Sequence, residues 1–520
     1  MRKKTIIEST IILTVASLIT RLIGFFYRIY MNNELGAYNM GLYQMIMPLY
    51  TFAWALICSG FTTTISKLAS EYASTSDIKS QKKVLYYGTF LSFLLSVFVS
   101  FIFITFSKEL SLSFLDDESY YFSIILISTS FPFMAVGSCI RGYFLGLYHP
   151  EVTSTSQVIE QLSRIGIIYL FVNFSGVLTI NIAILGIVFA EGISCFYSIY
   201  KYITYNSHSK AYNKSISKAL GHRRKFILNA VLVSAIPLSL NRVTHSLLHT
   251  YENLLITDSL VKYGYTREIA IEEFGKISGL TFPLIYFPTA IILSISTSLL
   301  ANISSLKARN NYIRINDLLY KVFNFTLILS FLFVSFFMSF ANEIGDLLYN
   351  TNISVYLVCF GATSPFLYMH MILSGVMNGL GNQLRLFANS LLSSFVSLFL
   401  IYTLTPKISV FGFVIGFSIC VALNTCLNYF IIKRELKLNI SIVKLTYKPL
   451  IACIITILAI NTFKLSVTVA LNFFTFGLFS VLLFTIYVLL LFAFGLFNLD
   501  DIAKVISMIK SKGANEQKLF

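Results

Sequence analysis

Fourteen apolar runs occupy most of this chain, and each is long enough to cross a membrane. A bilayer core of about 30 Å needs roughly 20 helical residues, because each residue advances an α-helix by about 1.5 Å. The runs lie at 6–31, 44–66, 84–107, 122–148, 152–174, 181–203, 226–258, 277–303, 319–341, 353–379, 382–403, 409–432, 447–464 and 470–497. With only 12% of its residues charged, the chain cannot cover a water-facing surface. We therefore expect an all-α polytopic membrane protein with fourteen transmembrane helices, and we exclude secreted, cytosolic-enzyme and nucleic-acid-binding classes.

The positions of Lys and Arg predict the orientation in the membrane. An even number of helices places both termini on one side. If that side is the cytoplasm, the inner segments hold 28 of the 39 basic residues and the outer segments hold six. Cytoplasmic loops are enriched in Lys and Arg, so both termini are expected to be cytoplasmic. The run at 6–31 is too long for the apolar region of a signal peptide and contains arginines, so we expect it to remain as the first helix.

Two pairs of runs indicate an internal duplication. The second and eighth runs align at an offset of 235 residues, which pairs Pro48 with Pro283. The fourth and tenth align at an offset of 233, which pairs Pro132 with Pro365. The shift is six helices, so both copies cross in the same direction and should be related by a pseudo-twofold axis along the membrane normal. We expect an N-terminal lobe at 1–225, a C-terminal lobe at 226–432, each with six helices, and a segment at 433–520 with helices 13 and 14 and a cytoplasmic tail.

Small residues inside the helices favour packing. Gly142 with Gly146, and Gly375 with Gly379, have the G-x-x-x-G spacing that lets two helices approach closely. All seven cysteines fall in predicted helices, which argues against a disulfide framework or a metal site.

Five arginines lie inside the predicted helices: Arg21, Arg28, Arg141, Arg164 and Arg242. An arginine near a helix centre costs about 2.5 to 3.5 kcal/mol on insertion scales, so the five together oppose insertion by about 12 to 17 kcal/mol. Water or polar partners must offset this cost. The arginines are therefore expected to face an aqueous cavity.

Their spacing places several of them on common helix faces. Arg21 and Arg28 are seven residues apart, which puts them two turns apart on one face. Arg242 and His249 repeat this spacing in helix 7, which corresponds to helix 1 in the second half of the chain. Each lobe is therefore expected to present a basic stripe to the cavity.

The predicted helices also contain carboxylates. Glu160 lies four residues before Arg164, so the two can pair, and Glu191 and Glu252 are further acidic groups within predicted helices. Five arginines against three carboxylates leave an excess of about two positive charges, which favours an anionic substrate. The expected substrate-binding residues are Arg21, Arg28, Arg164, Arg242, Glu160 and His249, and the residues that could couple transport to an ion are Glu191 and Glu252.

These residues also have structural interpretations that the sequence leaves open. Arg28 and Arg141 could extend to the lipid headgroups at the membrane surface, which is called snorkelling. Glu160 and Arg164 could form an ion pair that joins two helices, and Arg21 and Arg242 could pair with a carboxylate such as Glu191. His249 could be an ordinary packing residue.

The sequence contains no motif of an enzyme. It has no Walker loop, no H-E-x-x-H zinc motif and no nucleophile elbow, and no Cys/His spacing is typical of a metal site. We therefore expect no catalysis, no cofactor and no metal.

Three stretches resemble a known family: TRLIGFFYRIYMNNELGAYNMGLYQMIMPLY at 20–50, GFTTTISKLASEY at 60–72 and RGYFLGLYHPEVTSTSQVIEQLSRI at 141–165. They resemble the stage V sporulation protein B family, in the polysaccharide transporter branch of the multidrug/oligosaccharidyl-lipid/polysaccharide (MOP) flippase superfamily. The chain is also similar to the related lipid II flippases, whose first helix carries two cavity arginines that Arg21 and Arg28 match with one extra residue between them. It departs from them in helix 2, where their charged cavity residues have no counterpart at 41–56.

The resemblance implies a flippase of the bacterial plasma membrane. Its substrate would be an undecaprenyl-pyrophosphate-linked sugar precursor, with lipid II for peptidoglycan or spore cortex as the expected case. The implied partners are this lipid-linked oligosaccharide, the membrane lipids and enzymes of cell-wall synthesis. The alternatives are an exporter of a capsular or teichoic lipid-linked unit, a cation-coupled multidrug antiporter of the same superfamily, and a membrane scaffold or lipid-linked sugar polymerase that does not transport.

Overall fold

The computed structural model describes residues 6–74, 77–115, 117–212, 224–437, 441–466 and 472–496. Within these ranges every regular element is a helix, which confirms the all-α expectation. The chain divides into two compact units, Met1–Ala290 with Ser390–Phe417, and Ile291–Asn389 with Ser418–Phe520. The boundaries at 225 and 432 are predicted for two lobes related by an internal repeat, which is a different division from these compact units. These lobe boundaries stay a prediction.

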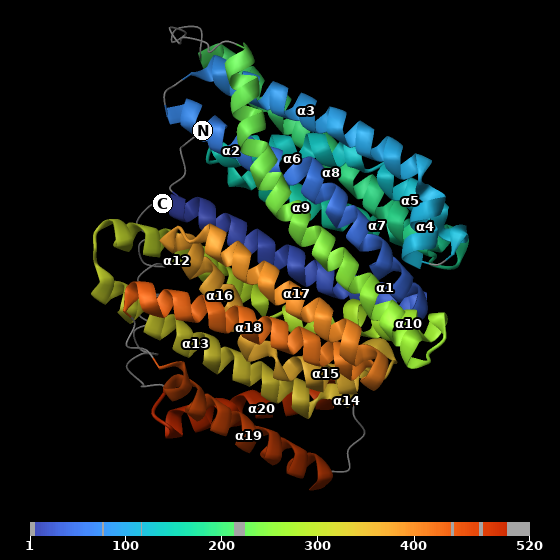
Figure 1. Cartoon of the computed structure of the whole chain (residues 1–520), viewed down its shortest axis with the longest axis vertical. Coiled ribbons are helices and arrows are strands. Elements are labelled where there is room, and N and C mark those ends of the chain that lie inside the picture. Colours follow the sequence, from blue (N-terminus) through green and yellow to red (C-terminus); the bar gives the residue numbers. More distant parts are fainter. Residues whose placement is uncertain are drawn as a thin grey trace. The chain divides into compact units, whose positions relative to one another are not determined.

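The first unit begins with the long N-terminal half of the chain. Its elements are α1 (Ile6–Trp54), η1 (Ala55–Ser59), α2 (Gly60–Ser74), α3 (Ile78–Thr105), α4 (Ser107–Leu115), η2 (Glu118–Tyr120), α5 (Tyr121–Ser128), α6 (Phe131–Gly146), α7 (Pro150–Ser175), α8 (Ile180–Tyr212), α9 (Arg224–Tyr263), α10 (Arg267–Gly275), η4 (Lys276–Thr281) and α11 (Phe282–Tyr286). Helices α2, α3 and α6 pack against one another, and α7 packs between α1 and α8 (Figure 1). Buried Phe131, Tyr143 and Phe144 are among the largest side chains of its core.

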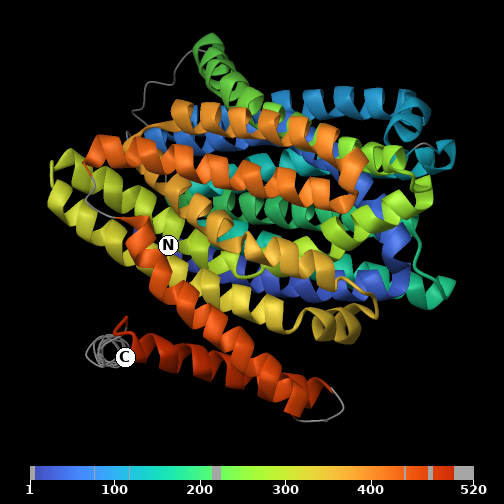
Figure 2. The same cartoon turned by 60° about the horizontal axis from the view of Figure 1, so that its bottom comes forward.

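The second unit is built on α13. Its elements are α12 (Thr289–Ala308), whose first two residues belong to the first unit, α13 (Tyr312–Ser339), α14 (Ala341–Ile344), η5 (Gly345–Tyr349), α15 (Ser354–Ala362), α16 (Ser364–Leu380), α19 (Ile442–Ser466) and α20 (Phe473–Ala493). Helices α17 (Gln383–Ile408) and α18 (Val410–Leu436) contribute residues to both units. Helix α19 packs on α13 and on α20 (Figure 2), and the hydroxyl of Tyr487 in α20 donates to the carbonyl of Ile328 in α13 at 3.0 Å.

The described helices include ten candidate membrane spans, or up to twelve if two bent helix pairs each count as one span. One of the ten extends over 56 residues from Leu18 to Ala73, about 84 Å of helix and more than twice the thickness of a bilayer core. Gly36 interrupts it with φ 74° and ψ 166°, a left-handed conformation that favours glycine. Gly36 therefore divides this stretch into two helical segments that correspond to the predicted helices 1 and 2, while the count of fourteen spans stays a prediction.

The element bounds repeat along the chain. Helix α3 runs from Ile78 to Thr105 and α13 from Tyr312 to Ser339, so both ends recur 234 residues later. The residues before them, Asp77 and Asn311, each accept a backbone hydrogen bond in the first turn, as N-caps do. These matches support the predicted duplication, while the axis that relates the two copies stays a prediction.

The predicted proline pair belongs to the same repeat. Pro132 and Pro365 lie in the first turns of α6 and α16, where a missing N–H removes no helical hydrogen bond. The pair α15 and α16 is bent by 47° at this point.

The two G-x-x-x-G segments make equivalent close approaches within their own units. A Cβ on Gly142 in α6 would lie 2.6 Å from the carbonyl oxygen of Thr62 in α2, and a Cβ on Gly375 in α16 would lie 2.6 Å from that of Ser296 in α12. The packing interpretation of these glycines is therefore confirmed, since no side chain fits where the backbones touch.

We expect Gly142→Ala to lower the free energy of unfolding by about 1 to 3 kcal/mol, because the added methyl group must push α6 away from α2. Gly166→Ala in α7 is the matched control, because nothing lies within 4 Å of its Cβ position. Alanine favours the helix there by up to about 1 kcal/mol. Thermal unfolding in detergent measures both variants, and equal melting temperatures would contradict the close approach.

Candidate functional site

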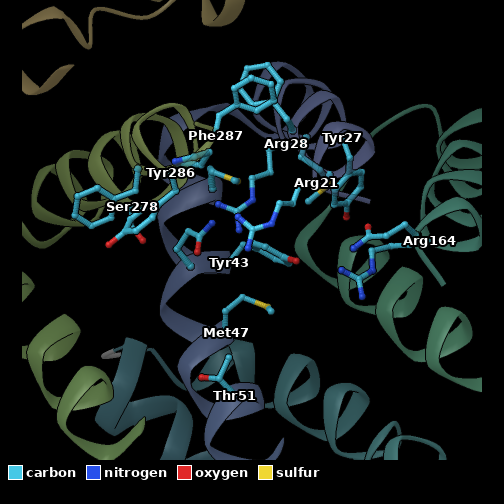
Figure 3. A pocket seen from close by; sticks show the side chains of 18 of the residues that line it. Arg21, Tyr27, Arg28, Tyr43, Met47, Thr51, Arg164, Ser278, Tyr286 and Phe287 are labelled. Atoms are coloured by element: carbon cyan, nitrogen blue, oxygen red, sulfur yellow. The ribbon is translucent and has the colours of Figure 1, made fainter. Parts of the chain in front are cut away.

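A cavity of about 550 Å³ opens inside the first unit. Its walls come from both segments of α1, from α7 and α9, from η4 and α11, and from Phe287 just after α11 (Figure 3). The lining residues are Thr20, Arg21, Gly24, Phe25, Tyr27, Arg28, Met31, Met40, Tyr43, Gln44, Met47, Pro48, Thr51, Gln161, Arg164, His249, Asn253, Ser278, Phe282, Pro283, Tyr286 and Phe287. Its size is within the range of small-molecule sites.

Helix α1 supplies two of the cavity's arginines. Arg21 and Arg28 lie on one face before the break at Gly36, and Figure 3 shows both side chains extending into the middle of the cavity. The guanidinium of Arg21 donates to the hydroxyl of Thr289 at 3.2 Å. Because of the break, the segment of α1 after Gly36 also lines the cavity, with residues such as Tyr43.

Arg164 reaches the cavity from α7 while it is held by a carboxylate. Its Nη2 atom lies 3.0 Å from Oε1 of Glu160, one turn earlier, which confirms the predicted pair. Oε2 of the same carboxylate lies 4.0 Å from Nη1 of Arg141 in α6. The three side chains are only 12 to 17% exposed, so one buried carboxylate is shared by two arginines.

Arg141 is part of this buried cluster, which differs from the headgroup contact that the sequence leaves open for it. It donates to the hydroxyls of Ser194 at 2.9 Å and Ser156 at 3.4 Å, in α8 and α7. The interpretation that Arg141 snorkels to a headgroup is therefore wrong, because its side chain points into the helix packing.

The two other in-membrane carboxylates lie outside the cavity lining. Glu191 in α8 is 4% exposed and accepts a hydrogen bond from the hydroxyl of Tyr50 at 2.7 Å, while its Oε2 atom has no hydrogen-bond partner among the described residues. Glu252 in α9 accepts from the hydroxyl of Ser397 in α17 at 2.9 Å. The structure does not pair Arg21 or Arg242 with Glu191, so that interpretation is also wrong.

Of the two residues in the basic stripe of α9, Arg242 and His249, only His249 lines the cavity. His249 lines the cavity together with Asn253, whose amide nitrogen lies 3.4 Å from Nδ1 of the histidine ring. Arg242 is exposed, and its guanidinium lies over the ring of Trp54, 5.6 Å from the centroid, outside the lining. The structure therefore brings Arg21, Arg28, Arg164 and His249 together, with Glu160 behind Arg164.

Sequence reasoning missed most of the neutral part of the lining, apart from Gln161, which belongs to the same polar stripe as Glu160 and Arg164. Tyr27, Tyr43 and Tyr286 contribute aromatic rings, and Gln44 and Ser278 contribute polar groups. In an apolar run a tyrosine reads as lipid-facing, so only Gln44 carried a usable signal, as an amide within a transmembrane segment.

The charge of the lining has one sign. It contains three arginines and one histidine, and none of the described residues that line it is a carboxylate. Guanidinium groups in a water-poor cavity bind anions through charge-assisted hydrogen bonds, and their planar fork matches phosphate oxygens. The described residues contain no group of His, Cys, Asp and Glu side chains suited to a metal ion.

The fold and this cavity define a class of membrane transporter. An inward closed structure of a lipid II flippase MurJ superposes with a TM-score of 0.68 at 15% identity, covering 93% of this chain and 98% of that one. An inward-facing MATE multidrug transporter of the MOP superfamily superposes with a TM-score of 0.66 at 12% identity, covering 82% of this chain and 98% of that one. The fold is that of MOP transporters.

Sequence comparison places the chain within this class. Residues 6–264 match the family described as polysaccharide biosynthesis protein, and residues 280–485 match the family described as lipid II flippase MurJ. Stage V sporulation protein B of Bacillus subtilis (strain 168) is 24% identical over 466 residues, 87% of this chain and 89% of that protein. Sporulation protein YkvU of the same organism is 22% identical over 85% of this chain and 98% of its own length. The chain belongs to the polysaccharide transporter branch of the MOP flippase superfamily, the branch of stage V sporulation protein B.

Proposed function

We propose that this protein flips an undecaprenyl-pyrophosphate-linked sugar precursor across the bacterial plasma membrane by alternating access. Lipid II, for peptidoglycan or spore cortex, is the substrate we expect. The single observation that carries the proposal is a cavity lined by three arginines and a histidine, with no carboxylate among the described lining residues. An anionic headgroup suits such a lining.

Each cavity residue has a role in the proposal. Arg21 and Arg28 bind the diphosphate from one helix face, and His249 adds a further donor. Arg164 approaches from α7, with Glu160 fixing its orientation. We give Arg242 no direct contact with the diphosphate, because its side chain lies over Trp54 outside the cavity. The prenyl tail stays in lipid.

The membrane potential supplies a driving force. With the termini in the cytoplasm, the headgroup is taken up inside and released outside. A membrane that is negative inside favours this movement by about 2.3 kcal/mol per negative charge per 100 mV. Enzymes of cell-wall synthesis would supply the substrate and consume it.

Glu191 is the carboxylate that we propose for ion coupling, with Glu252 as the second choice. Its Oε2 atom is buried and has no hydrogen-bond partner among the described residues, so this oxygen is where we propose that the coupling proton or sodium ion binds. We expect Glu191→Gln to remove the dependence of transport on the coupling gradient, because an amide takes up no proton and offers no negative charge to a sodium ion. Transport into liposomes with and without a pH or sodium gradient measures this effect, and Glu109→Gln, at an exposed carboxylate, is the control. An unchanged gradient dependence would move the assignment to Glu252.

Multidrug export is the rival function within the same fold. Lipophilic cations would need an acidic cavity, whereas this lining is basic. Resistance of cells to cationic dyes separates the two functions, and we expect no added resistance on expression of this protein.

Reconstitution tests the proposed function directly. Purified protein in liposomes should accelerate the movement of labelled lipid II between leaflets. Capsular and teichoic lipid-linked precursors are compared in the same assay. Faster movement of one of these precursors than of lipid II would reassign the substrate, and no acceleration of any would refute the function.

A further inference from the structure

Two buried polar atoms on one side of the cavity, Oε1 of Gln161 and Nε of Arg164, lack hydrogen-bond partners among the described residues. The hydroxyl of Tyr27 is a third buried polar atom on this side, with the side chain of Tyr43 as its polar neighbour, and all three residues line the cavity. Tyr27 is only 7% exposed. In Figure 3, Tyr27 and Arg164 lie on the same side of the cavity, beside the Arg21 and Arg28 side chains that fill its middle. Buried polar groups are normally hydrogen-bonded, so a ligand that pairs with these atoms gains affinity.

The chemistry of the three atoms differs from that of the two arginines on α1. Oε1 of Gln161 is a carbonyl oxygen and can only accept a hydrogen bond. The oxygens of an ionised diphosphate also only accept, so a diphosphate cannot pair with it. A hydroxyl or an acetamido N–H can donate to Gln161. A hydroxyl can also accept from Nε of Arg164, which lies three residues later on the same face of α7.

We propose that Tyr27 and Gln161, with Nε of Arg164, form a subsite for the first sugar of the substrate, which they recognise through a hydroxyl or an acetamido N–H next to the diphosphate. This inference rests on the proposed function, and it divides the cavity into a diphosphate site and a sugar subsite. Arg21 and Arg28 bind the diphosphate, and the Tyr27 side selects a glycosylated lipid over the bare prenyl diphosphate.

The helix positions agree with this division. Tyr27 directly precedes Arg28 in α1, so its side chain points about 100° away from that arginine around the helix. Gln161 and Arg164 belong to α7, which packs against α1. A diphosphate held by Arg21 and Arg28 therefore has these groups as neighbours on one side, where its first sugar would lie.

Two ligands separate the subsite from the diphosphate site. One is a short-chain prenyl diphosphate, and the other is the same molecule with a single N-acetylhexosamine attached. Their dissociation constants are measured with the purified full chain in nanodiscs. We expect Tyr27→Phe and Gln161→Leu each to weaken binding of the glycosylated ligand by about five- to fifteenfold, the effect of one hydrogen bond, and to change binding of the bare ligand by less than about twofold.

Two control variants show what a loss of diphosphate binding and the loss of a hydroxyl outside the cavity do to the same measurements. Arg21→Ala should weaken both ligands alike, because it acts on the diphosphate. Tyr169→Phe removes a hydroxyl from an exposed tyrosine of α7 outside the cavity and should change neither. Melting temperatures of all variants show whether the fold is kept, and Gln161→Leu provides a second test if Tyr27→Phe unfolds.

Each outcome decides one of the two proposals. Equal weakening of both ligands by Tyr27→Phe and Gln161→Leu, or no weakening, would overturn the sugar subsite and leave the proposed function standing. Failure of the unaltered protein to bind either ligand would refute the proposed function, and the subsite with it.

Discussion

Arg21→Ala is expected to reduce transbilayer movement of the lipid-linked substrate by about tenfold to a hundredfold or more. The guanidinium extends into the middle of the cavity, and its protein partner is the neutral hydroxyl of Thr289. Its charge is therefore available to a substrate anion. A hydrogen bond to a charged group contributes about 1.5 to 3 kcal/mol, so the loss of one such bond to the diphosphate is enough for an effect of about tenfold to a hundredfold.

The assay for this prediction separates transport from folding. Flipping is measured in liposomes that contain equal amounts of inserted protein. Arg314→Ala is the matched control, because Arg314 is an exposed arginine in the first turn of α13, outside the cavity lining. Lysine at position 21 keeps the charge but loses the planar fork, so Arg21→Lys should retain part of the activity. Full activity of Arg21→Ala would show that this arginine does not bind the substrate.

The part of the site that the sequence predicted follows from helix geometry alone. Seven residues are close to two helical turns, so Arg21 and Arg28 had to share a face. The cost of burying guanidinium groups in hydrocarbon then required a polar space beside that face. Both steps use only local spacing and solvation, and they hold wherever the neighbouring helices lie.

The same reasoning is less informative for α9. Arg242 and His249 share a face, but seven residues also separate them by about 10.5 Å along the helix axis. The cavity reaches His249 and ends before Arg242, which lies over Trp54 instead. Where a cavity ends along a helix depends on the neighbouring helices, and the spacing of the charges carries no information about it.

Two features of the site depend on tertiary contacts that the sequence does not show: the buried contacts of Arg141 and the position of Tyr43 in the cavity. The sequence leaves a headgroup contact open for Arg141, because its partners Ser194 and Glu160 come from other helices. Tyr43 became a cavity residue because α1 breaks at Gly36 and lines the cavity with both of its segments. The break at Gly36 and the serine partners of Arg141 leave no periodic pattern in the sequence, so helix periodicity cannot predict them.

The buried cluster around Glu160 leads to the second large effect, which concerns stability. We expect Glu160→Gln to lower the free energy of unfolding by about 3 to 5 kcal/mol. The substitution keeps the shape of the side chain but leaves Arg164 as a buried charge without its ion-pair partner, and it removes one of the two carboxylates, Glu160 and Glu191, that act on Arg141. Breaking a buried ion pair on one side has a cost of this size.

Thermal unfolding in detergent provides the measurement, with an exposed ion pair as the control. Glu71 lies 4.0 Å from Lys67, and both side chains are more than half exposed. Water compensates for the lost partner there, so Glu71→Gln should change the free energy of unfolding by less than about 1 kcal/mol. Similar losses for the two substitutions would mean that the Glu160 cluster is hydrated.

A double variant tests the physical reason for the loss. Adding Arg164→Gln to Glu160→Gln removes the guanidinium group that the single substitution leaves without its ion-pair partner, so the double variant should be less destabilised than the sum of the single variants by about 0.5 to 3 kcal/mol. Additive losses would mean that Glu160 and Arg164 stabilise the helices independently. In that case Glu160 would not orient Arg164, and the substrate contact proposed for Arg164 would lose its structural basis, whereas those of Arg21 and Arg28 would not depend on it.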